Sequence, residues 1–419
     1  MPSLRPSWVI QQVVPPAILT YFAWAWRRCT WTIGRDYLFL GLNHRWLGAF
    51  YMAATNILIP SVATIFLRLY FLPSTQSVPP CRPPVDIASL KCVFECSPPP
   101  QALDDGYSLV VRGSTPAPGT ADSLLSHCHR GRCGGRWKPA RARHCSECGV
   151  CRAGFDHHCA FFANCLTAPH LPAFLALCFL TPLAVFVLAT PVYWPLFFRA
   201  IAAWKESQVD PRAVAWWSWG PSWIVAGGPV GRWVAGLALG WRALDAVDGG
   251  LVAGSQRLEI GCLCVVGNVL AAITLALGWS TYTHIRDGEL TVDKERTRAL
   301  LRTRDSIAKL VAAAQPVPPA LTADLERFGP RHWFFVPTPD SATWAGVILP
   351  TLPLERPYNL GPEGNLDQAV SRGRGLRWLL PWVAVRAGMA QDEVLCWPLD
   401  PDVAARLAQD ADERVHAQT

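Results

Sequence analysis

Long apolar stretches separate proline-rich and charged segments along this chain, and they predict helices that cross a membrane. Residues 171–198 contain no charged side chain, residues 46–73 contain one, and residues 260–283 contain none. Each segment exceeds the roughly 20 mostly apolar residues that a helix needs to span a bilayer. A fourth apolar segment, residues 7–26, is interrupted by two adjacent prolines, so a helix buried within the protein is the alternative there. We expect an α-helical polytopic membrane protein with about four transmembrane helices.

Basic residues indicate which side of the membrane the segment between the second and third spans faces. Eight arginines and lysines lie between residues 112 and 152, and basic loops of this kind remain in the cytosol. Four spans then place both termini on the cytosolic side as well. The expected organisation is two spans in 1–73, a Pro-rich cytosolic lead-in in 74–125, a small cytosolic Cys-rich domain in 126–170, a third span in 171–200, a lumenal or interfacial Trp-rich loop in 201–257, a fourth span in 258–283 and a cytosolic tail in 284–419.

Two segments fit this topology less well. Residues 27–45 hold four arginines but would face the lumen. Residues 214–244 are rich in tryptophan and broken by glycines, a composition that suits the membrane interface. A fifth span in that segment is the alternative, and it would move the C-terminal tail to the other side of the membrane.

The most informative local pattern is a run of seven cysteines, interleaved with histidines, between residues 128 and 165. Closely spaced Cys and His ligands are typical of tetrahedral zinc sites, and they are less consistent with a secreted disulfide framework. Eight ligands suffice for two sites: Cys128, Cys133, His144 and Cys151 for one, and Cys145, Cys148, His158 and Cys165 for the other. Cys159 is left over, and it follows Asp156 and His157.

The order Asp-His-His-Cys predicts a particular geometry. Successive side chains of an extended segment point to opposite faces. If His158 binds a metal, His157 and Cys159 therefore share the other face, where an imidazole can hold the thiol as thiolate. Asp156 can orient His157, as the acid of a catalytic triad orients its base. The pattern predicts a nucleophilic cysteine on a loop stiffened by zinc; a further structural ligand or a buried thiol is the alternative for Cys159.

Residues 128–174 resemble the cysteine-rich domain of the DHHC protein S-acyltransferases (palmitoyltransferases). The resemblance rests on these residues: Lys138-Pro139-Ala140-Arg141, His144-Cys145, Cys148, Cys151, Asp156-His157-His158-Cys159, Asn164-Cys165 and Phe174. It implies a cytosolic domain with two structural zinc ions between membrane spans. It also implies that Cys159 takes a long-chain acyl group, palmitoyl in the usual case, from acyl-CoA and passes it to cysteines of membrane-associated substrate proteins, with His157 as base and Asp156 as its partner.

The chain departs from the family pattern at several positions. The first two cysteines are usually separated by two residues, whereas Cys128 and Cys133 are farther apart, so His127 or His129 could replace Cys128 as a ligand. The Pro-Trp that usually follows the catalytic cysteine is Ala160-Phe161, and the usual Gly and Asn after the last cysteine are Thr167 and His170. We expect these changes to affect packing more than chemistry.

Weaker resemblances lie downstream. Thr281 and Thr283 partly match a Thr-Thr-x-Glu motif, and Tyr358-Asn359-Leu360-Gly361 with Asn365 is similar to a C-terminal family motif. Residues 291–315 have the apolar periodicity of a surface helix, and residues 403–419 look like a solvated amphipathic end.

Composition agrees with a membrane enzyme. The chain is 51% hydrophobic and only 16% charged, whereas charged residues make up about a quarter of soluble domains. Its formal charge of +7 suits acidic headgroups and the CoA diphosphate, and the spans argue against nucleic-acid binding. We expect an endomembrane location, the endoplasmic reticulum or Golgi, with the active site facing the cytosol. The alternative functions are a non-catalytic zinc-binding membrane scaffold or adaptor and a transporter.

Overall fold

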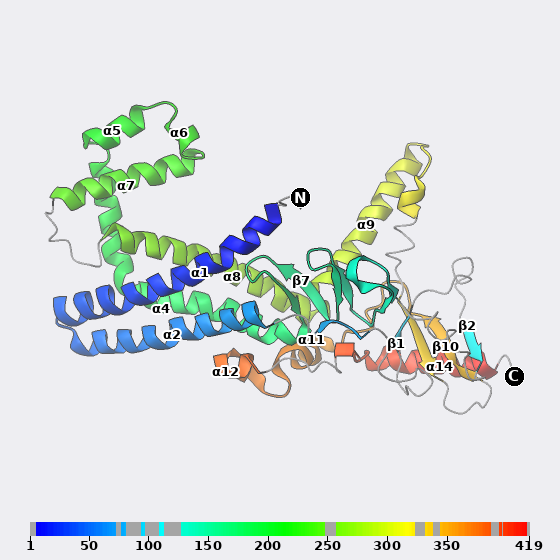
Figure 1. The fold of residues 1–419 in the computed structure, drawn as a ribbon. Helices are drawn as coiled ribbons and strands as arrows, with labels where there is room; N and C mark the ends of the chain where they lie inside the picture. The colour runs from blue at the N-terminus through cyan, green and yellow to red at the C-terminus, as the bar shows by residue number, and fades with distance from the viewer. Residues whose placement is uncertain are drawn as a thin grey trace. The chain divides into compact units, whose positions relative to one another are not determined.

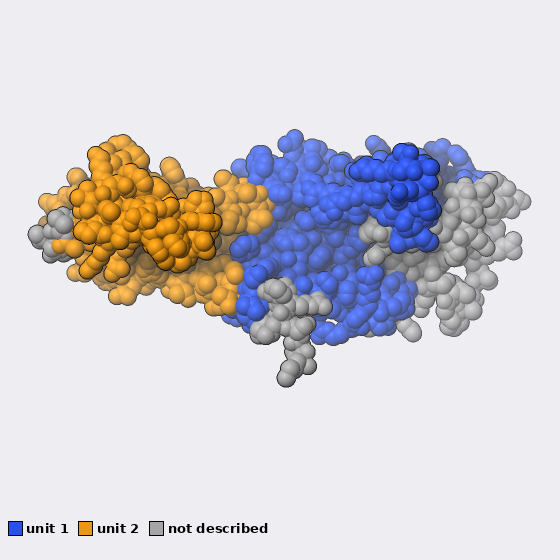
Figure 2. Space-filling view, turned by 90° about the horizontal axis from the view of Figure 1, so that it is seen from above, with its two compact units in different colours: residues 1–12, 68–176, 279–419 blue, residues 13–67, 177–278 orange. Residues whose placement is uncertain are grey.

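The chain divides into two compact units in a computed structural model (Figure 2). Unit 1 comprises residues 1–12, 68–176 and 279–419, and unit 2 comprises residues 13–67 and 177–278. The structure describes residues 6–72, 77–80, 94–96, 109–112, 127–247, 257–322, 332–337, 344–386, 394–395 and 397–416. Most of the apolar segments therefore belong to unit 2, and the Cys-rich segment belongs to unit 1.

The long helices agree with the apolar segments of the sequence. α2 (Arg45–Phe71), α4 (Leu171–Glu206) and α8 (Leu258–Arg286) are long and apolar enough to cross a membrane (Figure 1). This confirms helices at three of the four predicted spans, and α4 continues several residues beyond its predicted end. The fourth segment forms α1 (Pro6–Arg27), which contains Pro15 and Pro16. Since α1 is not among the three span candidates, a crossing there remains a prediction.

The helices of unit 2 pack around one apolar core. α1 continues into the π-helical segment η1 (Arg28–Gly41), which contributes the buried Ile33. Val192 of α4 and Ile260 of α8 are fully buried in the same core, and the Tyr51 hydroxyl of α2 donates to the Leu188 carbonyl at 2.8 Å. The opposite faces expose large apolar side chains, for example Phe186 of α4 at 65%. Such faces suit a lipid environment, because contact between large apolar side chains and water is unfavourable.

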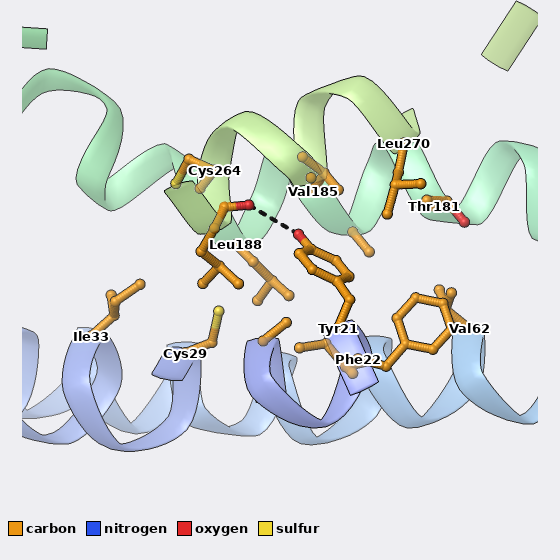
Figure 3. A pocket seen from close by; sticks show the side chains of 16 residues that line it. Tyr21, Phe22, Cys29, Ile33, Val62, Thr181, Val185, Leu188, Cys264 and Leu270 are labelled. Atoms are coloured by element: carbon orange, nitrogen blue, oxygen red, sulfur yellow. Dashed lines mark hydrogen bonds between the residues drawn. The ribbon is translucent and has the colours of Figure 1, made fainter. Parts of the chain in front are cut away.

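A pocket within unit 2 is lined almost entirely by apolar atoms (Figure 3). It lies between side chains of α1, η1, α2, α4 and α8. The Tyr21 hydroxyl, one of its few polar groups, donates to the Leu263 carbonyl at 3.0 Å. Phe22, Val62, Val185 and Leu270 form other parts of the wall. A lining of this kind favours a hydrocarbon chain over a polar ligand.

The predicted Trp-rich loop is helical. It forms α5 (Pro211–Ser218), α6 (Ser222–Val225) and α7 (Pro229–Val247). The Asp210 carboxylate caps α5 by accepting from the amides of Arg212 and Ala213, each at 3.0 Å. None of these helices is among the three span candidates found in the described residues.

The Cys-rich segment of unit 1 folds as three short antiparallel hairpins. β3 (His127–Cys128) pairs with β4 (Arg136–Trp137), β5 (Arg143–Cys145) with β6 (Val150–Arg152), and β7 (Phe155–Cys159) with β8 (Asn164–Thr167). Gly149 in the β5–β6 turn has a φ of +65°, a conformation that glycine adopts at little cost. Two- to five-residue strands cannot bury a core of their own, so such hairpins depend on another source of stability.

The lead-in and the C-terminal tail meet in a sheet that the sequence did not predict. β1 (Phe94–Glu95), β9 (Trp333–Pro337), β10 (Trp344–Pro350) and β2 (Leu109–Arg112) form an antiparallel sheet in the order β1-β9-β10-β2. α14 (Pro401–His416), expected to be a solvated end, packs against β9 and β10 and buries Leu407 and Ala411.

α9 (Thr291–Ala312) confirms the helix predicted in 291–315. Shorter helical elements are η5 (Gly131–Cys133), η6 (Ala168–His170), α11 (Gly361–Leu366), η8 (Asp367–Ser371), η9 (Gly375–Leu379) and α12 (Pro381–Ala384).

Candidate active site and metal centres

The first group of metal-ligating side chains joins the β3–β4 and β5–β6 hairpins. Cys128, Cys133, His144 and Cys151 place their ligand atoms within 4.8 Å of one another. The His144 Nδ1 lies 3.5 Å from the Cys128 sulfur and 3.4 Å from the Cys133 sulfur. His144 and Cys151 are directly opposite in the β5–β6 register. The structure thus brings Cys128 itself into this group.

The second group joins the β5–β6 and β7–β8 hairpins. Cys145, Cys148, His158 and Cys165 also lie within 4.8 Å of one another. The His158 Nδ1 is 3.6 Å from each of the three sulfur atoms. Because His144 and Cys145 are adjacent on β5, their side chains point to opposite faces and serve the two different groups.

Both groups have the chemistry and the dimensions of closed zinc sites. Zinc binds thiolate at about 2.3 Å and imidazole at about 2.0–2.1 Å, so tetrahedral nitrogen and sulfur ligands lie about 3.6 Å apart. The observed nitrogen–sulfur distances of 3.4–3.6 Å agree with this geometry. None of the cysteines that the structure describes forms a disulfide. The two groups could therefore each hold a metal ion with no ligand position left for a substrate.

Cys159 lies outside both groups, at the end of strand β7. In the β7–β8 register His158 is opposite Cys165, and Cys159 is opposite Asn164. Side chains alternate along this part of the strand. His157 and Cys159 therefore point to the face opposite the one from which His158 reaches the second metal group. Cys159 is buried, which shields its sulfur from bulk water.

A β-bulge allows Asp156 to reach its own neighbour. Consecutive residues of a regular strand point apart, but the β7–β8 register shifts between Phe155 and His157. Such a shift re-aims the extra side chain. The Asp156 Oδ2 consequently lies 2.7 Å from the His157 Nδ1, which leaves the Nε2 of that ring for a second partner.

The environment of His157 favours its charged form. Burial of the ring would lower its pKa, but hydrogen bonding to Asp156 and Cys159 and the charges of both raise that pKa to about 10. An imidazolium beside a thiol is the arrangement that stabilises a thiolate. Phe174 packs edge-on against the His157 ring, with 6.0 Å between the ring centroids, and Phe162 packs edge-on against Phe174. Phe174 thus contacts the His157 ring directly, and Phe162 supports Phe174.

Thr291 completes the set of Asp156 contacts. Its backbone amide donates to the Asp156 Oδ1 at 2.8 Å, and its hydroxyl donates to the Oδ2 at 3.1 Å. Burial would raise the pKa of Asp156, but the bonds from His157 and Thr291 and the His157 charge lower that pKa. The carboxylate is therefore ionised and fixed in orientation at the N-terminus of α9, where the helix dipole also favours a negative charge.

The sequence did not identify Thr291. The Thr-Thr-x-Glu resemblance was placed on Thr281 and Thr283, but the Thr283 hydroxyl bonds within its own helix to the Ser280 carbonyl at 2.8 Å. Leu290-Thr291-Val292-Asp293 retains the second threonine and an acid at the spacing of the motif. Thr291 lies ten residues beyond Thr281, outside the segment that the resemblance indicated.

Arg141 of the Lys-Pro-Ala-Arg segment connects the hairpins to the tail. Its guanidinium lies between the rings of Tyr358 and Trp397, 4.5 Å from each centroid. It also makes an ion pair with Asp293 at 3.2 Å and donates to the Gly288 carbonyl. Because its side chain is only 5% exposed, these contacts are well shielded from solvent, and they fix the start of α9, which carries Thr291.

The C-terminal motif and Asn164 supply further supports. The Asn365 side-chain amide donates to the Arg286 carbonyl at 3.0 Å, and the Tyr358 hydroxyl donates to Glu95 at 2.9 Å. The Asn164 amide donates to the Leu69 and Leu72 carbonyls at 3.0 and 2.7 Å. The short motifs noticed in the sequence thus lie in contact with helix ends and with the sheet.

Comparison with known proteins agrees with this geometry. A family model described as DHHC palmitoyltransferase matches residues 127–236. The chain is 38% identical over 72 residues to "Palmitoyltransferase AKR1" of Mortierella alpina. The aligned segment covers 17% of this chain and 12% of that protein.

Two plant proteins are also similar. "Probable protein S-acyltransferase 13" of Arabidopsis thaliana is 40% identical over 62 residues, covering 15% of this chain and 20% of that protein. "Probable protein S-acyltransferase 14" of the same plant is 43% identical over 72 residues, covering 17% and 22%. The similarity thus spans about a fifth or less of the length of these curated relatives. On the strength of the family match and the Asp-His-His-Cys strand, the chain carries a domain of the DHHC palmitoyltransferase family.

Proposed function

We propose that this protein is a protein S-acyltransferase that moves a long-chain acyl group, palmitoyl in the usual case, from acyl-CoA to cysteines of membrane-associated proteins. The observation that carries the proposal is Cys159: a thiol outside both metal groups, beside an imidazole that Asp156 orients. A zinc scaffold would need neither the free thiol nor the oriented ring. The names of the similar proteins, which are palmitoyltransferases and protein S-acyltransferases, support the same activity.

The first half of the reaction loads the enzyme. Cys159 as thiolate attacks the thioester carbonyl carbon of acyl-CoA, with the thiol proton held on His157. The carbon–sulfur bond to CoA breaks, and the CoA thiolate leaves with the proton from His157. The product is an acyl-Cys159 thioester and a neutral His157.

The second half regenerates the enzyme. The thiol of a substrate protein gives its proton to His157 and attacks the acyl-Cys159 carbonyl carbon. The carbon–sulfur bond to Cys159 breaks, Cys159 leaves as thiolate, and the acyl group remains on the substrate. Asp156 stays ionised throughout and stabilises the imidazolium whenever His157 holds the proton.

The two metal groups have a structural role in this proposal. Cys128, Cys133, His144 and Cys151 would hold one zinc ion, and Cys145, Cys148, His158 and Cys165 the other. Zinc with four protein ligands contributes folding energy. In particular, His158 would fix the strand from which His157 and Cys159 project.

The helices that could span a membrane are consistent with a lipid substrate. An apolar pocket lies within unit 2, and burial favours an acyl chain by about 0.8 kcal/mol per methylene. We propose that the Cys-rich domain faces the cytosol, since the basic residues predict this side, and that the enzyme resides in the endoplasmic reticulum or Golgi.

The direct test of the proposal is to locate the acyl group. The purified full-length protein is incubated with palmitoyl-CoA, digested and analysed by mass spectrometry. A palmitoyl group on the peptide that contains Cys159, removed by neutral hydroxylamine, is expected. Stable acylation of other cysteines with an unmodified Cys159 would reject the proposed nucleophile.

Thr291→Val should slow the acyl loading of Cys159 by about tenfold. The substitution keeps the shape of the side chain and the backbone amide bond but removes the hydroxyl that donates to Asp156. A hydrogen bond to a charged group contributes about 1.5–3 kcal/mol, and about 1.4 kcal/mol corresponds to a tenfold change. The measurement is the rate of loading at saturating palmitoyl-CoA.

Thr297→Val on the same helix is the matched control. The Thr297 side chain is exposed, and its hydroxyl bonds only to the Asp293 carbonyl of α9 itself. Its loading rate should equal that of the wild type. Equal rates for both variants would show that Thr291 does not position Asp156 for the reaction.

A further inference from the structure

The Trp-rich helices α5–α7, here called the Trp-rich cap, pack on the end of α4 within unit 2. The Trp204 ring of α4 stacks on Trp233 at 5.7 Å and meets Trp217 edge-on at 5.5 Å. The Trp217 indole donates to the Ser207 hydroxyl at 3.3 Å. The cap is therefore a folded element with a defined inner face.

The small residues of α7 belong to that inner face. A Cβ added at Gly236 would lie 2.0 Å from the Trp217 ring, and one at Gly240 would lie 2.1 Å from the Ala203 carbonyl oxygen. The space beside each glycine is thus occupied by other residues of the same chain. The two glycines cannot serve as the close-contact stripe through which apolar helices of two protein copies associate.

The outer face of the cap is apolar and exposed. The following side chains are 47–76% exposed: Trp219, Trp223, Ile224, Val225, Val230 and Val234. Exposed apolar residues of this size, gathered on one short element, indicate a surface that is covered in use.

Charge and helix length indicate which partner covers this face. α5–α7 contain three arginines and one acidic residue, Asp245, which pairs with Arg199 of α4 at 2.8 Å; Arg212 and Arg242 are exposed. Phosphate headgroups complement this charge, and tryptophan is enriched where headgroups meet acyl chains. With 8 and 4 residues, α5 and α6 are too short to cross a bilayer.

The cap is also continuous with surfaces suited to lipid. It joins α4 to α8, both of which are long and apolar enough to cross a membrane. α4 contains Pro182, Pro191 and Pro195, and its last turns bend away from the direction of the other long helices (Figure 1). Proline removes a helix hydrogen bond and bends the helix. Phe197 and Phe198, in the last turns of α4 before the cap, are exposed.

We propose that the Trp-rich cap docks into the interface of the phospholipid bilayer, with its exposed indole and aliphatic side chains at the boundary between headgroups and acyl chains. It neither spans the membrane nor lies free in solution. This element is a membrane contact beyond the candidate spans, and it does not depend on the proposed acyl transfer.

The test uses the full-length protein in bilayers that contain one of two photoreactive phospholipids. One carries its diazirine next to the headgroup, and the other at the end of an acyl chain. After illumination and digestion, labelled peptides are identified by mass spectrometry. Peptides from 211–244 should be labelled by the headgroup-proximal probe and not by the chain-end probe, whereas exposed residues of α8 should react with the chain-end probe.

Two results would overturn the proposal. Labelling of the cap by the chain-end probe to the level of α8 would mean that the cap spans the membrane. Labelling by neither probe would mean that solvent or a protein covers it.

A double variant provides a second measurement. Trp223→Glu with Val230→Glu puts two charges on the outer face and should reduce labelling of the cap to the level of α9, while acyl loading of Cys159 persists. Leu301→Glu with Val311→Glu is the control, because both residues are similarly exposed on α9. Unchanged labelling of the cap in the first variant would contradict docking through this face.

Discussion

Cys159→Ser is expected to lower the rate of acyl loading by about 1,000-fold or more, with both metal groups intact. A hydroxyl is a far weaker nucleophile than a thiolate at neutral pH, and the His157–Asp156 pair is built to hold a thiolate. Losses of this size are ordinary when the nucleophile of a covalent mechanism is removed. The measurement is hydroxylamine-labile palmitoyl on the protein after incubation with palmitoyl-CoA.

The metal content of the same variant separates chemistry from folding. Cys159 is outside both ligand groups, so the variant should retain two zinc ions per chain. Cys262→Ser is the matched control, because Cys262 is an exposed cysteine of α8. It should leave both loading and zinc unchanged. A Cys159→Ser protein that still acquires a hydroxylamine-labile acyl group at the normal rate would exclude Cys159 as the nucleophile.

Loss of the second metal group is expected to abolish loading by a different route. Cys148→Ser removes one ligand of the second metal group, whose four ligand atoms, that of His158 included, lie within 4.8 Å of one another. Structural zinc contributes about 10–16 kcal/mol in small zinc-dependent domains, which is as large as the usual stability of a whole domain, about 5–15 kcal/mol. The variant should bind about one zinc ion, and its β5–β8 hairpins should open to proteolysis.

Zinc analysis, limited proteolysis and loading are measured together on this variant. Loading should fall with the zinc content because His157 and Cys159 flank the ligand His158 on one strand. Treatment of the wild type with a zinc chelator should reproduce the loss, and Cys262→Ser should again resemble the wild type. If Cys148→Ser kept both zinc ions and full loading, the assignment of the second ligand group would be wrong.

The sequence was sufficient for features that local spacing controls. Apolar length predicted α2, α4 and α8, because a run of uncharged residues has few ways to be satisfied other than as a long helix in lipid. The spacing of cysteines and histidines predicted the two groups that the structure brings together. Alternation along an extended strand separated His158 from Cys159, since that period is a property of the backbone itself.

Long-range pairing was beyond the sequence. The sheet joins strands β1 and β2 of the Pro-rich lead-in to β9 and β10 of the tail. Two- to seven-residue strands carry too weak a pattern to indicate their partners, because register depends on what each face buries. For the same reason, α14 was taken for a solvated end although it packs on that sheet.

Local order in the chain thus determined the kind of chemistry: which residues could bind metal, which thiol is left over, and which helices are long enough for a bilayer. Only the tertiary structure decided how that chemistry is held. Thr291 meets Asp156 across 135 positions of sequence, and Arg141 contacts Tyr358 and Trp397 of the distant tail. Such contacts form because burial makes an unpaired carboxylate or guanidinium costly, and which residue supplies the partner depends on the fold that surrounds it.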